Sequence, residues 1–397
     1  MAKVEKLLKR FRMVFEDQNF YEAHQVARTI YYRWLELNEY EKLTGFLSEK
    51  ILEFAKVNEP TITFDLGDLY AKTLVQSAAP VNDSILDQIE KLVEALSKLE
   101  VRVTDQKSSP NPLIPIVTQL INWSTESSSA SLIEHQYGNA RLNLIFAKVF
   151  EAKNQFELAK KHYICSKDPQ AYAQFIIKNF NHLTGSDEEK EAPESSHHLE
   201  EDSFITLTVL QVLSIGRVGV ATKLLHLLVE KHNKYSARPP FASALLNFTW
   251  LLTFSVQLRS IEYFTELVET YKPTLTRDSR ILYHVDKIGQ KFFGVPEKEQ
   301  GFGGGILGSL LKGMSTKKEV KLENPMDFKP DDVEFLTEYK ITDQGFHSTW
   351  DAASGRNPPG SCTEPHFSDA LEEQHAHAPS SHKIQRSKRH GSRLIWL

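Results

Sequence analysis

The chain has 397 residues, of which 41% are hydrophobic and 25% are charged, and its formal net charge is −5 at pH 7. This composition is typical of a globular protein with a buried core, and the lack of a basic surplus argues against nucleic acid as its partner. The two cysteines, Cys165 and Cys362, are too few for a disulfide framework, so we expect a reducing compartment, the cytosol.

Helical periodicity dominates from an N-terminal segment that is charged throughout and lacks the apolar core of a signal peptide. It is clearest where Ser84 and Asp87 resemble a capping box and apolar residues follow at spacings of three and four. The most apolar stretch, Leu245 to Leu258, is too short to span a bilayer, so we expect a buried helix there and no direct membrane insertion. A last helix is predicted from Arg277 to Phe293.

A short pattern of Asn, any residue, an aromatic residue and Glu occurs three times, beginning at Asn19, Asn38 and Asn154. Each copy lies between two helical segments, where Asn can supply the turn or cap and the aromatic residue can begin the next helix. Small and aromatic residues around the third copy have the spacing of a tetratricopeptide-type hairpin. The predicted fold class is therefore all-α, a tetratricopeptide-like helical-hairpin solenoid with a disordered C-terminal tail.

Changes in composition divide the chain. Eight acidic residues between 185 and 203 predict a solvated loop, and Gly301 to Gly305 predict a flexible joint. The apolar patch Ile306 to Leu311 has helical spacing but is too short to be a stable helix alone. The predicted units are 1–184, the N-terminal solenoid half; 185–203, the acidic loop; 204–294, the C-terminal solenoid half; 295–314, the glycine hinge and short apolar helix; and 315–397, the disordered tail.

Two local patterns suggest ligand chemistry, and each has a simpler interpretation. Gly303, Gly305 and Gly308 have dinucleotide-binding spacing, but a helix precedes them where that motif requires a strand, which favours a hinge. His197 and His198 could bind a metal, but no cysteine or carboxylate ligands accompany them at regular spacing, which favours solvated side chains.

Two further features each have a functional interpretation and a simpler one. Cys165 has no obvious base beside it, which favours a small core residue over a nucleophile. The basic residues around Lys388 and Arg389 could be a nuclear import signal or a nucleic-acid patch, although a solvated basic end is the simpler interpretation. We expect no catalytic residue, no cofactor and no metal site, and an α-helical hydrolase is the disfavoured alternative.

The predicted N-terminal hairpin carries Tyr21, His24, Arg28 and Arg33, which are aromatic, titratable or cationic. His24 and Arg28 are four residues apart and share one helix face. The face is either simply solvated or an electrostatic docking surface for a protein partner.

The helices between residues 204 and 293 carry more apolar side chains than one buried face requires, for example Trp250, Phe254 and Tyr271. Most of these side chains should belong to the solenoid core. The surplus predicts a groove for a partner segment, because an exposed apolar patch is otherwise a liability.

Several unusual blocks are similar to those of a known family and occur in order from about residue 5 to residue 313. They begin at Tyr21 (YEAHQVART), Tyr137 (YGNARL), Ser166 (SKDP), Pro239 (PPF) and Ile288 (IGQKFFGVP). By these blocks the chain resembles the Golgi-to-ER traffic protein 4 family in its animal form. Residues 315–397 do not resemble the family.

The resemblance implies a non-enzymatic scaffold in the cytosolic pathway that delivers tail-anchored membrane proteins to the endoplasmic reticulum. The N-terminal half would dock the targeting ATPase of that pathway. Asp65 falls where the family has an aspartate, so it joins the residues of the N-terminal hairpin. The expected ATPase-docking residues are Tyr21, His24, Arg28, Arg33 and Asp65.

The resemblance also implies that the C-terminal half binds a large Bag-family chaperone with its ubiquitin-like subunit. The residues expected to bind this chaperone partner are Trp250, Phe254 and Tyr271. The alternative function is that of another all-helical adaptor, such as a soluble attachment protein in membrane fusion. That adaptor would bind a disassembly ATPase in place of a targeting ATPase.

Overall fold

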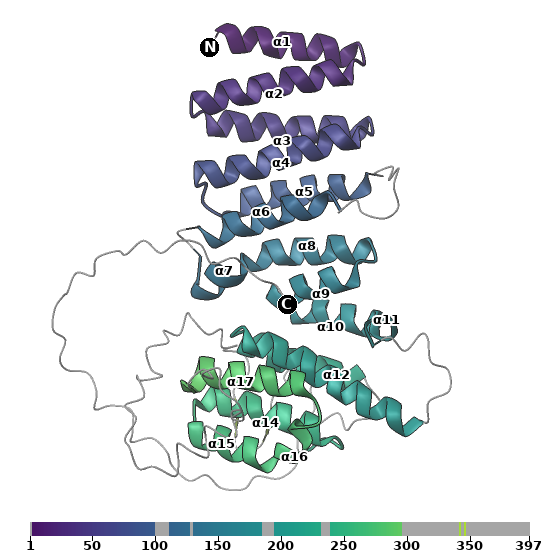
Figure 1. The fold of residues 1–397 in the computed structure, drawn as a ribbon, viewed down its shortest axis with the longest axis vertical. Coiled ribbons are helices and arrows are strands. Elements are labelled where there is room, and N and C mark those ends of the chain that lie inside the picture. Colours follow the sequence, from purple (N-terminus) through teal and green to yellow (C-terminus); the bar gives the residue numbers. More distant parts are fainter. Residues whose placement is uncertain are drawn as a thin grey trace, which may run out of the picture. The chain divides into compact units, whose positions relative to one another are not determined.

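The structure, a computed structural model, describes residues 2–99, 111–127, 130–184, 194–231, 239–295, 341–342 and 345–346. Most of these residues are helical, in the order α1 to α17, and successive helices pack as hairpins (Figure 1). This confirms the predicted all-α, tetratricopeptide-like helical-hairpin solenoid. None of the described helices combines the length and the apolar character that crossing a bilayer requires.

The first six helices are coloured purple to blue in Figure 1, and short turns join the first four into antiparallel neighbours. They are α1 (Ala2–Glu16), α2 (Phe20–Glu36), α3 (Tyr40–Lys56), α4 (Pro60–Ser77), α5 (Asp83–Lys98) and α6 (Leu113–Thr125). Helix α1 packs on α2, α3 packs on α4, and α4 packs on α6.

Helix α5 illustrates how the sequence directs this packing. Its apolar residues recur at spacings of three and four, so a single apolar stripe is buried. The predicted capping box of Ser84 and Asp87 is wrong, because Ser84 already lies inside the first turn. Asn82 caps the helix, and its side-chain oxygen accepts a hydrogen bond of 3.0 Å from the amide of Ile85.

The Asn-x-aromatic-Glu pattern marks turns between helices, as predicted, but its copies are not equivalent. Asn38 and Asn154 follow the ends of α2 and α8 with φ angles of 54° and 56°. Asn19 lies one position later in its turn, where it caps α2 by accepting a hydrogen bond from the amide of Glu22. The asparagines therefore serve as left-handed turn residues in two copies and as a cap in the third.

The middle of the chain continues the hairpins with shorter helices. They are α7 (Leu132–Tyr137), α8 (Ala140–Ala152), α9 (Phe156–Cys165), α10 (Pro169–Lys178) and α11 (Phe180–Thr184). Helix α8 packs on α9 and on α5, and α10 packs on α13.

The C-terminal helices gather around α12 and are coloured teal to green in Figure 1. They are α12 (Glu194–Ser214), α13 (Val218–Lys231), α14 (Ala244–Leu258), α15 (Ile261–Thr270), α16 (Lys272–Leu275) and α17 (Ser279–Phe293). The predicted buried helix corresponds to α14 and the predicted last helix to α17, each within two residues.

The acidic loop predicted for residues 185–203 is wrong from Glu194 onward, where α12 begins. Its last acidic residue, Asp202, is buried and hydrogen-bonded to the hydroxyl of Ser243, the residue that caps α14. Burial raises the pKa of Asp202, although the hydrogen bond from Ser243 opposes that effect. The density of acidic residues suggested solvation, but the apolar pattern after Ser203 extends as one helix towards the N-terminus.

One buried hydrophobic cluster extends from Val4 in α1 to Val295 after α17, so both predicted halves contribute to a shared core. A separate unit holds β1 (Ile341–Thr342) and β2 (Gly345–Phe346), which pair antiparallel with Ile341 opposite Phe346. The predicted glycine hinge, the apolar patch Ile306 to Leu311 and the rest of the tail lie outside the described residues.

Candidate functional site

Asp65 on α4 binds two side chains of α2. One carboxylate oxygen, Oδ2, lies 2.7 Å from Nε2 of His24, and the other, Oδ1, accepts a hydrogen bond of 2.9 Å from Nη1 of Arg28. Arg28 and the hydroxyl of Tyr32 lie 3.5 Å apart. Three predicted docking residues from two helices, His24, Arg28 and Asp65, therefore form one cluster with Tyr32, which we call the Asp65 cluster.

The Asp65 cluster is half-buried, and the neighbours of Asp65 determine the pKa of its carboxyl group. Burial by itself would raise the pKa of Asp65, but the hydrogen bond with His24 and the charge of Arg28 outweigh it and hold the pKa below its usual value. The carboxylate is therefore fixed in its ionised form near neutral pH, and it keeps the guanidinium of Arg28 in one position.

A second polar contact continues from α4 to α6. Asp68, one turn after Asp65, accepts a hydrogen bond of 2.6 Å from the side-chain amide of Gln119. Lys72 lies 2.6 Å from the other carboxylate oxygen of Asp68. Asp65 thus connects α4 to α2, and Asp68 connects α4 to α6.

The other two predicted docking residues lie apart from the Asp65 cluster. Tyr21 is 75% exposed and lies on α2 one turn before His24, so it extends the same helix face. Arg33 follows Arg28 by five residues, which places it about 140° further around the helix axis. There Arg33 forms an exposed ion pair of 3.6 Å with Glu36.

Tyr32 is not among the predicted docking residues, although the sequence contains a signal for its contact with Arg28. Tyr32 follows Arg28 by four residues, the spacing at which side chains on a helix meet. Gln119 had no such signal, because 51 residues separate it from Asp68 in the chain.

The three predicted chaperone-binding residues line one groove between α14 and α15, with a volume of about 440 Å³. Trp250 and Phe254 form an edge-to-face pair with ring centroids 5.0 Å apart, and Tyr271 packs against Phe248 with ring centroids 5.7 Å apart. The lining is mainly apolar, with Glu266 as its charged residue. The structure therefore brings these three residues together, which we call the α14–α15 groove.

Two further residues of the α14–α15 groove were missed. Leu258 and Tyr263 both line it, and each is 60% exposed. Trp250, Phe254 and Leu258 repeat at intervals of four along α14, so the sequence contained a signal for Leu258. The indole N–H of Trp250 is buried without a hydrogen-bond partner among the described residues.

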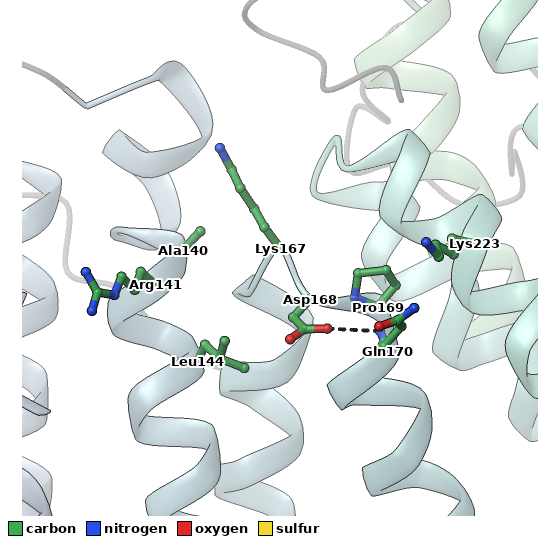
Figure 2. Close-up of a pocket in the computed structure, with 8 residues that line it drawn as sticks. All are labelled: Ala140, Arg141, Leu144, Lys167, Asp168, Pro169, Gln170 and Lys223. Carbon is green, nitrogen blue, oxygen red and sulfur yellow. Dashed lines mark hydrogen bonds between the residues drawn. The ribbon is translucent and has the colours of Figure 1, made fainter. Parts of the chain in front are cut away.

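Figure 2 shows a second depression, of about 420 Å³, between α8, α10 and α13. Its charged groups do not converge on a ligand, since Arg141 and Lys167 extend away from Asp168 in different directions (Figure 2). Arg141 pairs instead with Asp83 at 2.8 Å, and Asp168 caps α10 by accepting from the amides of Gln170 and Ala171. This depression therefore lies where three helices meet, and its charged residues have structural roles.

The candidates for metal or covalent chemistry gain no support from the described residues. No group of three or more His, Cys, Asp or Glu side chains with metal-binding geometry occurs among them. Cys165 is buried, and burial raises the pKa of its thiol to about 12, which suppresses the reactive thiolate. His197 and His198 belong to the first part of α12, where the side chains are outside the description.

Comparisons with known proteins identify the relatives of this chain. A family model described as Golgi to ER traffic protein 4 matches residues 38–315. The Golgi to ER traffic protein 4 homolog of Takifugu rubripes is 29% identical over 311 residues, which cover 78% of this chain and 88% of the relative. The human homolog is 26% identical over 329 residues, covering 82% of this chain and 92% of the relative.

A solved structure agrees with this assignment at the level of the fold. The crystal structure of C. therm. Get4 superposes with a TM-score of 0.58 at 18% sequence identity, and the match covers 81% of this chain and 98% of that one. Because the family model matches well over half of the sequence, the chain belongs to the Golgi to ER traffic protein 4 family.

Proposed function

We infer that the protein is a non-enzymatic scaffold of a cytosolic complex, and that it hands tail-anchored membrane proteins to a targeting ATPase for insertion into the endoplasmic reticulum membrane. Family membership supports a role in Golgi-to-ER traffic. The observation that carries the finer proposal is that one helical scaffold presents two chemically different surfaces. One surface is the charged Asp65 cluster and the other is the apolar α14–α15 groove.

The Asp65 cluster is the proposed docking surface for the targeting ATPase. Asp65 holds Arg28 in a defined position, so less conformational entropy is lost when a partner carboxylate binds the guanidinium. Tyr21 and Tyr32 are exposed on the same face of α2 and supply apolar area beside the charges. Aromatic residues and arginine together are typical of the residues that dominate binding energy at protein interfaces.

The α14–α15 groove is the proposed site of the large Bag-family chaperone with its ubiquitin-like subunit. An amphipathic helix could lay its apolar side chains between Trp250, Phe254 and Leu258, the mode by which many partner segments enter helical grooves. A scaffold that holds chaperone and ATPase together raises the effective concentration of the client near the ATPase, with no need for chemistry of its own.

The ATPase assignment is tested with two variants that carry the same charge change on the same helix. Arg28→Glu should weaken binding of the purified targeting ATPase at least about tenfold, because it removes the anchored guanidinium of the docking surface. Arg33→Glu is the matched control. Arg33 was an expected docking residue, but it lies on another side of α2 beside Glu36, so the proposed surface leaves it out and this variant should bind almost normally. Affinities are measured by biolayer interferometry, and circular dichroism verifies that both variants are folded.

Tyr21→Ala makes the test independent of the hydrogen bonds within the Asp65 cluster. Tyr21 is exposed and has no part in those bonds, so its truncation should weaken ATPase binding without changing the melting temperature. Unchanged binding in both Arg28→Glu and Tyr21→Ala would refute the docking surface. Binding of a membrane-fusion disassembly ATPase in place of the targeting ATPase would instead support the soluble attachment protein alternative.

A further inference from the structure

The α14–α15 groove exposes large apolar side chains that an apolar ligand would cover. Leu258 of α14 and Tyr263 of α15 both line it and are each 60% exposed, which is unfavourable for large apolar side chains. A short helix with leucine side chains would fill the groove and cover both of these side chains.

The described solenoid ends beside one wall of this groove. Phe293, the last residue of α17, stacks on Phe264 of α15 with ring centroids 4.5 Å apart. Gly289 allows this contact, because a β-carbon there would lie 3.2 Å from the ring of Phe264 and 3.3 Å from Val295. The chain therefore leaves the solenoid against α15, whose Tyr263 and Glu266 line the groove.

The sequence that follows carries a suitable ligand within reach. Ile306, Leu307, Leu310 and Leu311 have the spacing i, i+1, i+4 and i+5, which gathers four apolar side chains on one face of a short helix. Ten residues, 296–305, separate this patch from Val295 and can extend about 33 Å. Helix α15 has 10 residues and is about 15 Å long, so the tether is long enough to pass around it.

We propose that residues Ile306–Leu311 bind the α14–α15 groove of the same chain as an intramolecular ligand. A tether of this length gives an effective concentration on the order of millimolar, so even weak apolar contacts keep the segment docked. A helix this short is marginal alone in water, and docking supplies the contacts that stabilise it. The apolar residues Leu394 to Leu397 are a competing segment, but they follow Val295 by a far longer stretch of chain, which lowers their effective concentration.

The first test uses the full-length protein without any partner. Leu307→Asp/Leu310→Asp should accelerate amide hydrogen exchange in α14 and α15 by about tenfold, because the segment no longer covers the groove. Exchange in α3 and α4 provides the internal reference. Leu394→Asp/Ile395→Asp is the matched control, with two apolar residues replaced by aspartate elsewhere in the tail, and it should leave exchange in α14 and α15 unchanged.

The second test traps the contact by disulfide formation in a Cys362→Ser background, in which the buried Cys165 is the remaining natural thiol. Leu258→Cys with Leu310→Cys should form an intramolecular disulfide at least about tenfold faster than Tyr283→Cys with Leu310→Cys. Tyr283 is a matched control because it is 57% exposed and lies on α17 outside the groove lining.

Equal trapping rates for the two cysteine pairs, or unchanged exchange in Leu307→Asp/Leu310→Asp, would overturn the proposal. Faster exchange in the Leu394→Asp/Ile395→Asp control alone would overturn it as well, since the other segment would then be the occupant. Neither test contains a chaperone or an ATPase. A failure here is therefore distinct from a failure of the proposed scaffold function.

Discussion

At the scale of single residues, Asp65 fixes the contact between α2 and α4, since each of its carboxylate oxygens binds a different side chain of α2. Neither Arg28 nor His24 could take this role, because each makes one hydrogen bond to the shared carboxylate. Removal of the charge would leave Arg28 next to a neutral group in a half-buried position, which is unfavourable.

Asp65→Asn is therefore expected to lower the free energy of unfolding by about 1–3 kcal/mol at pH 7. Because the folded state lowers the pKa of Asp65, the stabilisation is present above the ordinary aspartate pKa and is lost as pH falls through the lowered value. The difference between wild type and variant should thus be full at pH 7 and shrink below about pH 4. Urea denaturation at both pH values measures it.

Glu94→Gln is the control for Asp65→Asn. Glu94 also forms an ion pair, of 2.7 Å with Lys98, but both side chains are exposed on the outer face of α5. Exposed pairs of this kind contribute little, so the control should unfold at nearly the same urea concentration as the wild type. An equal loss of stability in the two variants would contradict the special position of Asp65.

The members of the Asp65 cluster differ in how well they can be predicted from the sequence. His24 and Arg28 are four residues apart, so helical periodicity placed them on one face. Asp65 follows them by 41 and 37 residues, and only the family resemblance pointed to it. Pairing between helices depends on how the hairpins pack, which the local sequence pattern does not encode.

At the scale of elements, the turns that join the first helices repeat with a constant period. The left-handed residues Gln18, Asn38, Asn58 and Ala78 are spaced by 20 residues, with φ angles between 47° and 59°. Each follows a helix end, where a left-handed residue allows the chain to reverse and begin the next helix. The sequence pattern that began at Asn19 was therefore one residue out of register, because it followed residue type and not turn position.

Ala78 is the least suitable residue in this series. Its φ of 47° brings its β-carbon close to the backbone, and it lacks the side-chain polarity with which Asn tolerates this conformation. Its amide still caps α4 through the carbonyl groups of Leu74 and Val75. Ala78→Gly should therefore raise the free energy of unfolding by about 0.5–1 kcal/mol, measured as a higher melting temperature.

The control for Ala78→Gly is the same substitution at a position where alanine has right-handed helical geometry. Ala55 lies in the last turn of α3 with ordinary helical geometry, so Ala55→Gly should lower the free energy of unfolding by up to about 1 kcal/mol. A lower melting temperature for Ala78→Gly as well would show that the left-handed turn after α4 is not the conformation of the folded protein.

Element boundaries followed the sequence well wherever one strong signal dominated. Helix α17 ends at Phe293 as predicted, because Gly294 adopts a φ of 66° and terminates it. Helix α12 begins at Glu194, ten residues before the predicted boundary at residue 204. That boundary was wrong because the acidic residues of the first turns of α12 are also typical of a solvated loop. Glutamate is also a good helix former, so composition alone could not decide between the two outcomes.

At the scale of the whole solenoid, the two halves of the sequence division meet in a junction that is buried. Arg217, in the turn between α12 and α13, is fully buried and donates a hydrogen bond of 3.0 Å to the carbonyl oxygen of Cys165 at the end of α9. Lys291 of α17 donates a hydrogen bond of 2.7 Å to the carbonyl oxygen of Ile215 in the same turn. Gly216 must be glycine here, since its φ is 103° and a β-carbon would lie 3.0 Å from Lys291.

This junction bears on how far the scaffold can be divided. The predicted boundary at 185–203 separates two halves in sequence, yet α10 packs on α13 and the hydrophobic cluster continues across both. Burial, together with the charge of Arg217, lowers the pKa of Lys291 to about 8. We therefore expect the halves to unfold cooperatively, with the junction as the place where that coupling is made.

Arg217→Ala tests this coupling. It removes a fully buried side chain and leaves the carbonyl oxygen of Cys165 without this donor, so the free energy of unfolding should fall by about 2–4 kcal/mol. Amide hydrogen exchange should become faster in α12–α17 than in α1–α5, because the C-terminal helices lose their anchor on α9. Lys231→Ala, at the exposed C-terminal end of α13, should change stability by less than about 0.5 kcal/mol. Equal acceleration in both sets of helices, or a loss as small as that of Lys231→Ala, would contradict the coupling through Arg217.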